Sequence, residues 1–217
     1  MFYQRLHECF LNLAKENGLL AKTVTFQTKI LKTTEAIGNP GRQDYPLLKG
    51  KEFLMEATFM EVKGQAYTDA PSEFSGTLND IVQLSLANTK QRALFIATLN
   101  AVMRFLFPDL KTIHCKNNEP EECADEIVKF VQRTTSGNVG LLGLQPAFLE
   151  ALVKTFGAAG VSCVDRDEDF RGEVKYGVPI IWGEDQALLE LFERADLVLA
   201  TGSTIINGSL EGILQLA

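Results

Sequence analysis

The chain has 217 residues, of which 46% are hydrophobic and 23% charged, and its formal net charge at pH 7 is -7. This length and composition are those of a globular protein with one large domain or two small ones. The negative charge excludes a general nucleic-acid binder, because such proteins neutralise phosphates with an excess of Lys and Arg.

The sequence also predicts a cytoplasmic protein without a membrane partner. No apolar stretch approaches the roughly 18 residues of a membrane span, and the N-terminal segment lacks the apolar run of a signal peptide. Four cysteines in a chain of this length do not form the dense disulfide framework of small secreted domains. We therefore expect reduced thiols.

The first half of the sequence predicts an α+β domain over residues 1–110. Its first helix places apolar side chains, with Cys9 among them, at the spacing of one buried face, and Gly64 is the expected turn between two strands. The expected elements are a helix at 2–17, a strand at 24–30, an irregular loop at 35–50, strands at 53–62 and 64–68, and helices at 78–86 and 89–107.

Residues 111–137 predict a linker with a helix that buries Cys123, Ile127, Phe130 and Val131. From Asn138 onward the pattern changes, because short apolar runs alternate with amphipathic helices. Such alternation is typical of parallel strands joined by helical crossovers, and it predicts an α/β, Rossmann-like domain over residues 138–217. The apolar runs are at 139–144, 161–164, 178–182 and 196–200, and the helices begin at Pro146, Asp185 and Ser209.

The turn after the first apolar run lacks the G-x-G-x-x-G spacing with which a dinucleotide-binding fold approaches a pyrophosphate. Pro146 also removes an amide donor from the start of the helix, so NAD binding is not supported. Asp165 nevertheless ends the second run about twenty residues later, where that fold binds ribose hydroxyls with a carboxylate. Asp165 therefore predicts either a contact with an adenosine-type ligand or the start of a solvated loop.

The strongest candidate site is formed by Thr201, Gly202, Ser203 and Thr204, which follow the fourth apolar run, together with Asn207. In an open parallel sheet, ligands bind outside the carboxyl ends of the strands. Hydroxyls and helix-start amides suit an anionic or polyhydroxylated molecule, and Gly202 would permit close backbone approach or a positive φ. The same residue types also form ordinary turns and caps, so both interpretations stay open.

His114 and Cys115 are adjacent soft ligand types in a polar stretch, and we expect them to hold a divalent or heavy-metal ion if the chain binds one directly. The paired C-x2-C or H-x3-H spacing of zinc sites is missing here, so a structural role for both side chains is the alternative. With two histidines and no G-x-S-x-G, the sequence gives no support for a Ser-His-Asp triad.

Residues 195–214, ADLVLATGSTIINGSLEGIL, carry the most specific pattern in the chain. This stretch resembles a family of unknown function that is described as "putative heavy-metal chelation". The first half is similar to the partner domain of that family, where Thr98-Leu99-Asn100-Ala101 is the closest match. The resemblance is strong toward the C-terminus and loose before Asn88.

The resemblance implies an enolase N-terminal-like domain combined with a Rossmann-like domain, with a site in the cleft between them. The residues that match the family motif would line that cleft; they are Thr201, Gly202, Ser203, Thr204 and Asn207. Asn100 would face the cleft from the first domain. The family pattern continues into a further strand where this sequence ends at Ala217, so we expect the Rossmann-like domain to be C-terminally incomplete.

Three functional interpretations follow. The first is a protein that binds a small molecule or a metal complex and serves metal homeostasis. The second is an enzyme that uses an adenosine-type or other anionic ligand near Asp165. The third is a structural partner that forms homo-oligomers. The last helix would expose Leu210, Ile213, Leu214 and Leu216 unless it finds a partner or folds back onto the sheet.

Overall fold

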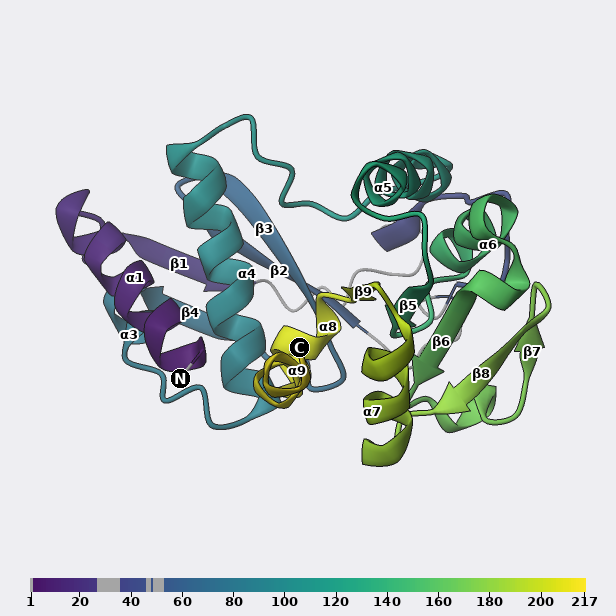
Figure 1. Ribbon diagram of the computed structural model, residues 1–217. Helices are drawn as coiled ribbons and strands as arrows, with labels where there is room; N and C mark the ends of the chain where they lie inside the picture. The colour runs from purple at the N-terminus through teal and green to yellow at the C-terminus, as the bar shows by residue number, and fades with distance from the viewer. Residues whose placement is uncertain (1, 27–35, 46–47, 49–52) are drawn as a thin grey trace. The chain divides into compact units, whose positions relative to one another are not determined.

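A computed structural model describes residues 2–26, 36–45, 48 and 53–217 (Figure 1). The chain is a mixed α/β protein with a four-stranded sheet of order β3-β2-β1-β4 and a five-stranded sheet of order β7-β8-β6-β5-β9. Its contacts form two compact units, each discontinuous in sequence. Unit 1 comprises Met1–Asn39, Pro46–His114 and Gly202–Glu211, and unit 2 comprises Pro40–Tyr45, Cys115–Thr201 and Gly212–Ala217.

Unit 1 packs helices against one face of its antiparallel sheet. Large apolar side chains from the sheet, such as Phe59, share one core with Phe10 and Phe95 of the helices. The expected strand at 24–30 is described only to Phe26, and its remainder, like part of the expected loop at 35–50, lies outside the described residues. The elements are α1 (Phe2–Glu16), β1 (Thr23–Phe26), β2 (Phe53–Phe59), β3 (Val62–Thr68), β4 (Phe74–Thr77), α3 (Leu78–Val82), α4 (Thr89–Leu106) and α8 (Ser203–Asn207).

Helix α4 lies across β2 and β3 (Figure 1), and the closest approach is at Gly64. A Cβ at this position would lie 2.1 Å from the backbone nitrogen of Ala101 and 2.5 Å from the carbonyl oxygen of Ala97. The predicted turn at Gly64 was therefore wrong, since this glycine lies inside β3 for packing. The turn is formed by Met60 and Glu61, which both adopt positive φ, 48° and 67°.

Helix α1 buries Phe10 and Ala14, as its pattern predicted, but Cys9 is exposed. Successive residues of an α-helix are about 100° apart, so a residue directly before Phe10 faces away from the core. The expectation that Cys9 is a core thiol was therefore wrong. His7 packs its ring on Phe95 with the centroids 5.9 Å apart.

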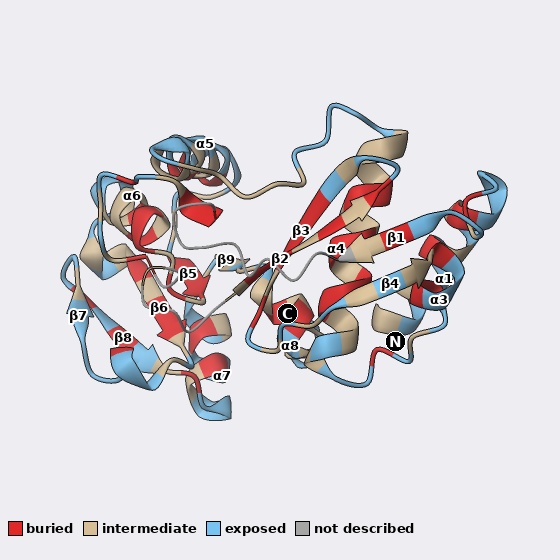
Figure 2. Cartoon of the chain, turned by 180° about the vertical axis from the view of Figure 1, so that it is seen from behind, coloured by how far each residue is buried: buried red, intermediate tan, exposed pale blue. Residues whose placement is uncertain are grey.

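Unit 2 is a three-layer arrangement. Helices α5 and α6 cover one face of the five-stranded sheet, where Val131 and Leu149 meet Leu141, and α7 and α9 cover the other face. Figure 2 shows the buried residues concentrated on the central strands. The elements are α5 (Glu119–Thr134), β5 (Val139–Leu142), α6 (Pro146–Phe156), β6 (Val161–Asp165), β7 (Val174–Lys175), β8 (Val178–Trp182), α7 (Asp185–Arg194), β9 (Leu197–Ala200) and α9 (Leu210–Leu216), with short 3-10 turns at Ala158–Gly160 and Glu168–Phe170.

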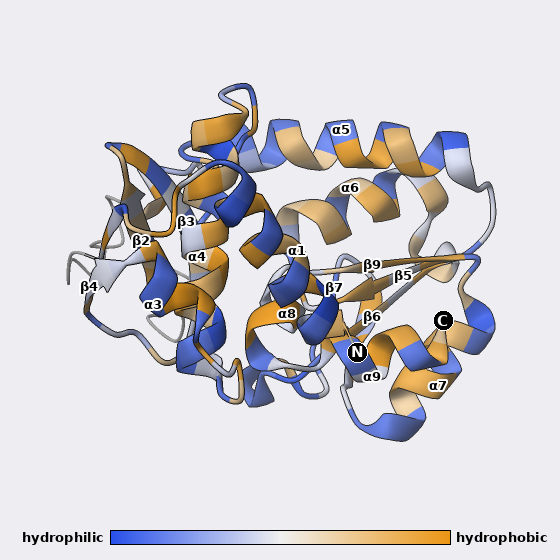
Figure 3. Cartoon of the chain, turned by 90° about the vertical axis from the view of Figure 1, so that its left-hand side faces the viewer, coloured by the Kyte–Doolittle hydropathy of each residue, from blue (hydrophilic) through white to orange (hydrophobic). Residues whose placement is uncertain are grey.

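Helix α5 is amphipathic, with hydrophilic and hydrophobic residues alternating along its length (Figure 3). Its buried residues are Ala124, Val128 and Val131. Phe130, which was expected on this face, is 60% exposed. The spacing of 124, 128 and 131 defines the buried stripe, and a residue one position before Val131 lies outside it.

The C-terminal helix α9 folds back onto the sheet of unit 2. Ile213 is 6% exposed and packs in a cluster with Leu142, Val164 and Leu188. This is one of the two outcomes expected from its apolar stripe, and homo-oligomer formation stays a prediction. In the described ranges, no helix is long and apolar enough to cross a membrane.

The close approach at Gly64 predicts a strong response to Gly64→Ala. The added methyl would displace the backbone of α4, so we expect the free energy of unfolding to fall by about 3 kcal/mol, the upper end of the usual cost of overpacking. Urea unfolding measures this change. Gly212→Ala is the control, since a Cβ there meets no atom within 4 Å, and equal stability of the two variants would contradict the packing argument.

Candidate functional site

The sheet of unit 2 changes its winding direction at β5. From β5 the chain proceeds to β6 and β8 on one side, whereas β9 pairs in parallel with the other side of β5. Leu142 at the end of β5 is in register with Ala200 at the end of β9. The loops after these two strands therefore leave the same edge side by side, which is where ligands bind in open parallel sheets.

Gly143 and Thr201 meet at this switch point. Gly143 has a φ of +89°, and a Cβ on it would lie 2.4 Å from the Thr201 hydroxyl oxygen. The Thr201 N–H donates to the Leu142 carbonyl at 3.0 Å, and the Gly143 N–H donates to the Val164 carbonyl at 2.9 Å. The Thr201 hydroxyl is therefore held against backbone at the carboxyl edge, in a position that requires glycine at residue 143.

Sequence reasoning missed Gly143, because the β5–α6 turn was compared with the dinucleotide fingerprint and set aside. The available signal was a glycine directly after one apolar run and a Thr-Gly pair directly after another. What the sequence does not contain is the pairing of β9 with β5, which brings the two turns together.

Asp165 connects the loops at the ends of β5 and β6. One carboxylate oxygen accepts the Leu144 N–H and the other accepts the Asp167 N–H, the latter at 2.6 Å. The Leu144 amide belongs to the turn that would contact a phosphate in a dinucleotide fold, and here a carboxylate of the same chain takes it. The adenosine contact of Asp165 stays a prediction.

The predicted loop is divided between the two units after Thr201. Gly202 has φ -60° and ψ -20°, and a Cβ on it would meet no atom within 4 Å. The expectation of a positive φ or a close approach at Gly202 was therefore wrong, and both properties belong to Gly143. The chain enters α8 directly after Gly202, which explains its helical dihedral angles.

The other residues of the predicted site lie in unit 1. Ser203 begins α8, Thr204 is 6% exposed within the fold, and the Asn207 side-chain oxygen accepts the Ser209 N–H at 2.9 Å. The Asn100 amide donates to the Gln65 carbonyl at 2.8 Å. These contacts agree with the alternative of a capped turn for Asn207, and the binding roles of all four side chains stay predictions.

His114 and Cys115, the expected soft metal ligands, lie on either side of a boundary between the units. The His114 N–H donates to the Gln65 side-chain oxygen at 2.7 Å, and its ring packs edge-on against Tyr67 at 5.1 Å between centroids. Among the residues that the structure describes, no three His, Cys, Asp or Glu side chains gather to hold a metal ion. The described residues thus lack the four-donor set of a structural zinc site.

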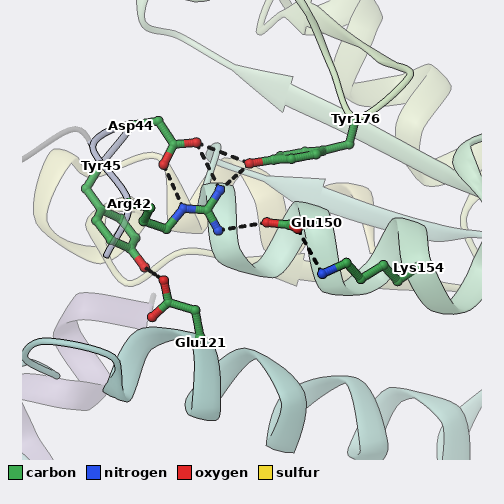
Figure 4. A network of polar contacts seen from close by, with 7 residues as sticks. All are labelled: Arg42, Asp44, Tyr45, Glu121, Glu150, Lys154 and Tyr176. Carbon is green, nitrogen blue, oxygen red and sulfur yellow. Dashed lines mark hydrogen bonds and ion pairs between the residues drawn. The ribbon is translucent and has the colours of Figure 1, made fainter. Parts of the chain in front are cut away.

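A second polar cluster in unit 2 was not predicted, because its members are far apart in sequence (Figure 4). Arg42 donates to both carboxylate oxygens of Asp44, at 2.7 and 3.0 Å, and to Glu150 of α6 at 3.0 Å. The Tyr176 hydroxyl, in the turn between β7 and β8, contacts both Arg42 and Asp44. We call residues 40–45 the strap, since they attach to several elements of unit 2.

The strap also contacts α5, where the Tyr45 hydroxyl donates to Glu121 at 2.9 Å. Hydrogen bonding to Asp44 raises the pKa of Arg42, although burial opposes that shift. Burial alone would raise the pKa of Asp44, but the hydrogen bond and charge of Arg42 outweigh it and hold this pKa below its ordinary value. Because the charges of Arg42 and Asp44 compensate each other, we interpret the cluster as a structural ion-pair network that attaches the strap to the other elements of unit 2.

Comparison with known families gives a match over the C-terminal part of the chain. Residues 126–217 fit the profile of the DUF364 family, which is described as "Putative heavy-metal chelation". This part of the chain is similar to DUF364. The match covers β5, Asp165 and the whole 195–214 stretch, so the resemblance that those residues carried is confirmed.

The fold of the DUF364 segment and of the preceding residues has a solved counterpart. The crystal structure of a DUF364-family protein of unknown function from Pyrococcus horikoshii, at 2.70 Å resolution, aligns with 100% of this chain and 75% of that one. The TM-score is 0.59 and the sequence identity 16%. At this identity the likeness shows a common fold. Comparison with curated proteins gives no match.

The ion pair between Arg42 and Asp44 predicts that the effect of Arg42→Met on the free energy of unfolding depends on pH. The variant leaves Asp44 without its cation, whereas Glu150 keeps its ion pair with Lys154. We therefore expect a loss of about 1–2 kcal/mol in the free energy of unfolding at neutral pH, a modest value because Asp44 is partly exposed to solvent. Since the pKa of Asp44 is lowered by folding, this stabilisation is present above the unfolded pKa, roughly 4. It is lost as the pH falls through the folded pKa.

Urea unfolding of wild type and Arg42→Met at neutral pH and near the folded pKa of Asp44 measures this dependence. The difference between the two proteins should shrink at the acidic pH. Glu193→Gln, on the exposed side of α7, should differ little from wild type at either pH. A difference that is equal at both pH values would show that the Arg42 contribution is not ionic.

Asp165→Asn tests the link at the carboxyl edge of the DUF364 segment. Asparagine keeps the shape but presents an NH2 group to one of two N–H donors, so we expect destabilisation by about 1–3 kcal/mol and faster hydrogen exchange at the Leu144 amide. The matched control is Asp109→Asn on an exposed turn. Unchanged exchange at Leu144 would contradict this assignment.

Proposed function

We propose that this protein binds a small oxygen-rich molecule, or a metal ion carried by such a molecule, at the carboxyl edge of the five-stranded sheet. The observation that carries the proposal is the approach of Gly143 to the Thr201 hydroxyl at the switch point. Open parallel α/β sheets bind ligands at such a switch point, outside the carboxyl ends of the strands.

The strand order supports the proposal. The order β8-β6-β5-β9 is that of the first four strands of a doubly wound nucleotide-binding fold, and on this basis we assign unit 2 to the Rossmann-like class. For unit 1, helices on one face of an antiparallel sheet are compatible with the enolase N-terminal-like class that the sequence resemblance implies.

The charges near the edge bear on the type of ligand. The loop after β6 carries Asp167, Glu168 and Asp169, and their negative potential disfavours a strongly anionic molecule. A hydroxyl-rich molecule or a metal complex with reduced charge is compatible with this field. Such a complex would bring most of its own donor atoms, so it does not need a complete set of protein ligands.

The family description supports a role in metal handling, and we propose metal homeostasis as the process served. A metal ion in a citrate complex is a suitable probe, because citrate supplies both hydroxyl and carboxylate donors. If side chains of the protein also ligate the metal directly, we propose His114 and Cys115 for that role. Further contacts implied by the resemblance are Ser203, Thr204, Asn207 and Asn100.

Thr201→Val tests the proposed site, because it keeps the shape of the side chain and removes the hydroxyl. We expect citrate complexes of Ni²⁺ or Fe³⁺ to raise the melting temperature of wild type, and the variant to bind about tenfold more weakly, or about 1.4 kcal/mol. The metal content of the purified protein, measured by mass spectrometry, should fall in parallel.

The matched control is Thr134→Val, which makes the same change at the end of α5, directly before β5 and thus at the opposite edge of the sheet. Citrate alone and the metal salts alone separate the contributions of the carrier and the ion. Equal protection of wild type and both variants by every probe would show that Thr201 belongs to a turn and not to a binding site.

A further inference from the structure

The chain contains two Asn-Gly pairs, Asn17-Gly18 and Asn207-Gly208, and both asparagines are exposed. In such a pair the glycine amide nitrogen can attack the side-chain Cγ of the preceding asparagine, because glycine has no Cβ to obstruct the approach. The attack forms a five-membered imide. Whether a folded protein promotes or hinders this reaction depends on the hydrogen bonds around each pair.

At Asn207 the surrounding hydrogen bonds favour the reaction. The Ser209 N–H donates to the Asn207 side-chain oxygen at 2.9 Å, and this oxygen becomes negatively charged when Cγ is attacked. A donor that is already aimed at a developing oxyanion stabilises the transition state. Asn207 is also the last residue of the one-turn helix α8, and Gly208 follows it in the left-handed region with φ 90°, so only a terminal turn must open.

Arg92 acts on the nucleophile. Its guanidinium donates to the Asn207 main-chain carbonyl at 3.1 Å and to the Ile206 carbonyl at 2.7 Å. The Asn207 carbonyl belongs to the same peptide unit as the Gly208 nitrogen. A cation bonded to that oxygen withdraws electron density and favours loss of the proton from the nitrogen, which is the form that attacks.

We propose that Asn207-Gly208 is a self-modification site, at which the fold promotes conversion of Asn207 to aspartate or isoaspartate. The Gly208 nitrogen forms a bond to Asn207 Cγ, and the bond from Cγ to Nδ2 breaks. The departing NH2 group takes the proton of the Gly208 N–H and leaves as ammonia. Solvent water then opens the imide at either carbonyl. This proposal does not depend on the proposed function.

The Asn17-Gly18 pair provides an internal reference with the opposite arrangement. The Asn17 side-chain NH2 donates to the Leu13 carbonyl at 2.9 Å, which holds the side chain against α1. The Gly18 N–H donates to the Lys15 carbonyl at 3.1 Å, so the proton that must be lost is hydrogen-bonded. The contact of the Asn17 side chain through its NH2 group hinders attack, whereas the contact of the Asn207 side chain through its oxygen favours attack.

The product changes unit 1 in a defined way. Hydrolysis replaces a neutral amide by a carboxylate close to the Arg92 guanidinium, and the isoaspartyl form also inserts a methylene into the backbone at the end of α8. Because the main-chain oxygens of residues 205–207 accept bonds from Tyr3 and Arg92, the isoaspartyl form must disturb the attachment of α8 to the rest of unit 1.

The experiment compares both pairs in one sample. Purified full-length protein is incubated at mildly alkaline pH, and peptide mass spectrometry follows the mass gain from replacing NH2 by OH at each asparagine. In the folded protein we expect Asn207 to react about tenfold faster than Asn17, a difference of about 1.4 kcal/mol in activation free energy. In urea the two rates should be similar, because the fold no longer distinguishes them.

Two variants complete the test. Asn207→Gln should remove most of the mass gain, whereas Asn17→Gln should leave it nearly unchanged. Arg92→Met should slow Asn207 several-fold relative to Asn17 in the same protein, and a faster rate would show that Arg92 restrains the turn instead of activating it. Equal rates in the folded protein, or a ratio unchanged by urea, would overturn the proposal.

Discussion

The parallel pairing of β9 with β5 is the constraint on which the candidate site depends. Strand β9 is the last strand in sequence, but it lies beside the central strand with Leu142 in register with Ala200. This register places the Thr201 hydroxyl so close to the β5 turn that residue 143 has no room for a side chain. One pairing thus fixes where the two loops diverge, which of the nearby glycines is required, and where a ligand can approach.

The polar groups of unit 2 serve two different purposes. Around the strap, Arg42, Asp44, Glu150 and Tyr176 bind one another, so their polar contacts attach the strap to α6 and to the turn between β7 and β8. At the carboxyl edge, Asp165 is likewise used by backbone amides. The functional proposal rests on Thr201 because its hydroxyl lies at the switch point, between the loops that follow β5 and β9.

The description of the DUF364 family as "Putative heavy-metal chelation" and the geometry of the chain are compatible if the metal arrives with its own ligands. Transition metals are held by several donors of suitable softness and geometry, and the described part of the chain offers no ready group of three. In the proposed function, the hydroxyl and backbone groups of the sheet edge would recognise the organic part of a complex. Specificity would then reside in the shape and charge of the carrier molecule.

The sequence by itself determined most secondary structure, because hydrophobic periodicity is a local property. The helices at Thr89–Leu106 and Asp185–Arg194 and the positions of four strands from Val139 onward could be predicted in this way. It also indicated the DUF364 resemblance and Thr201. Tertiary structure alone decided that Gly64 packs under α4, that Gly143 and not Gly202 needs the left-handed conformation, and that Arg42 belongs with Tyr176. These facts depend on which distant segments pair, and neither periodicity nor local turn chemistry encodes that choice.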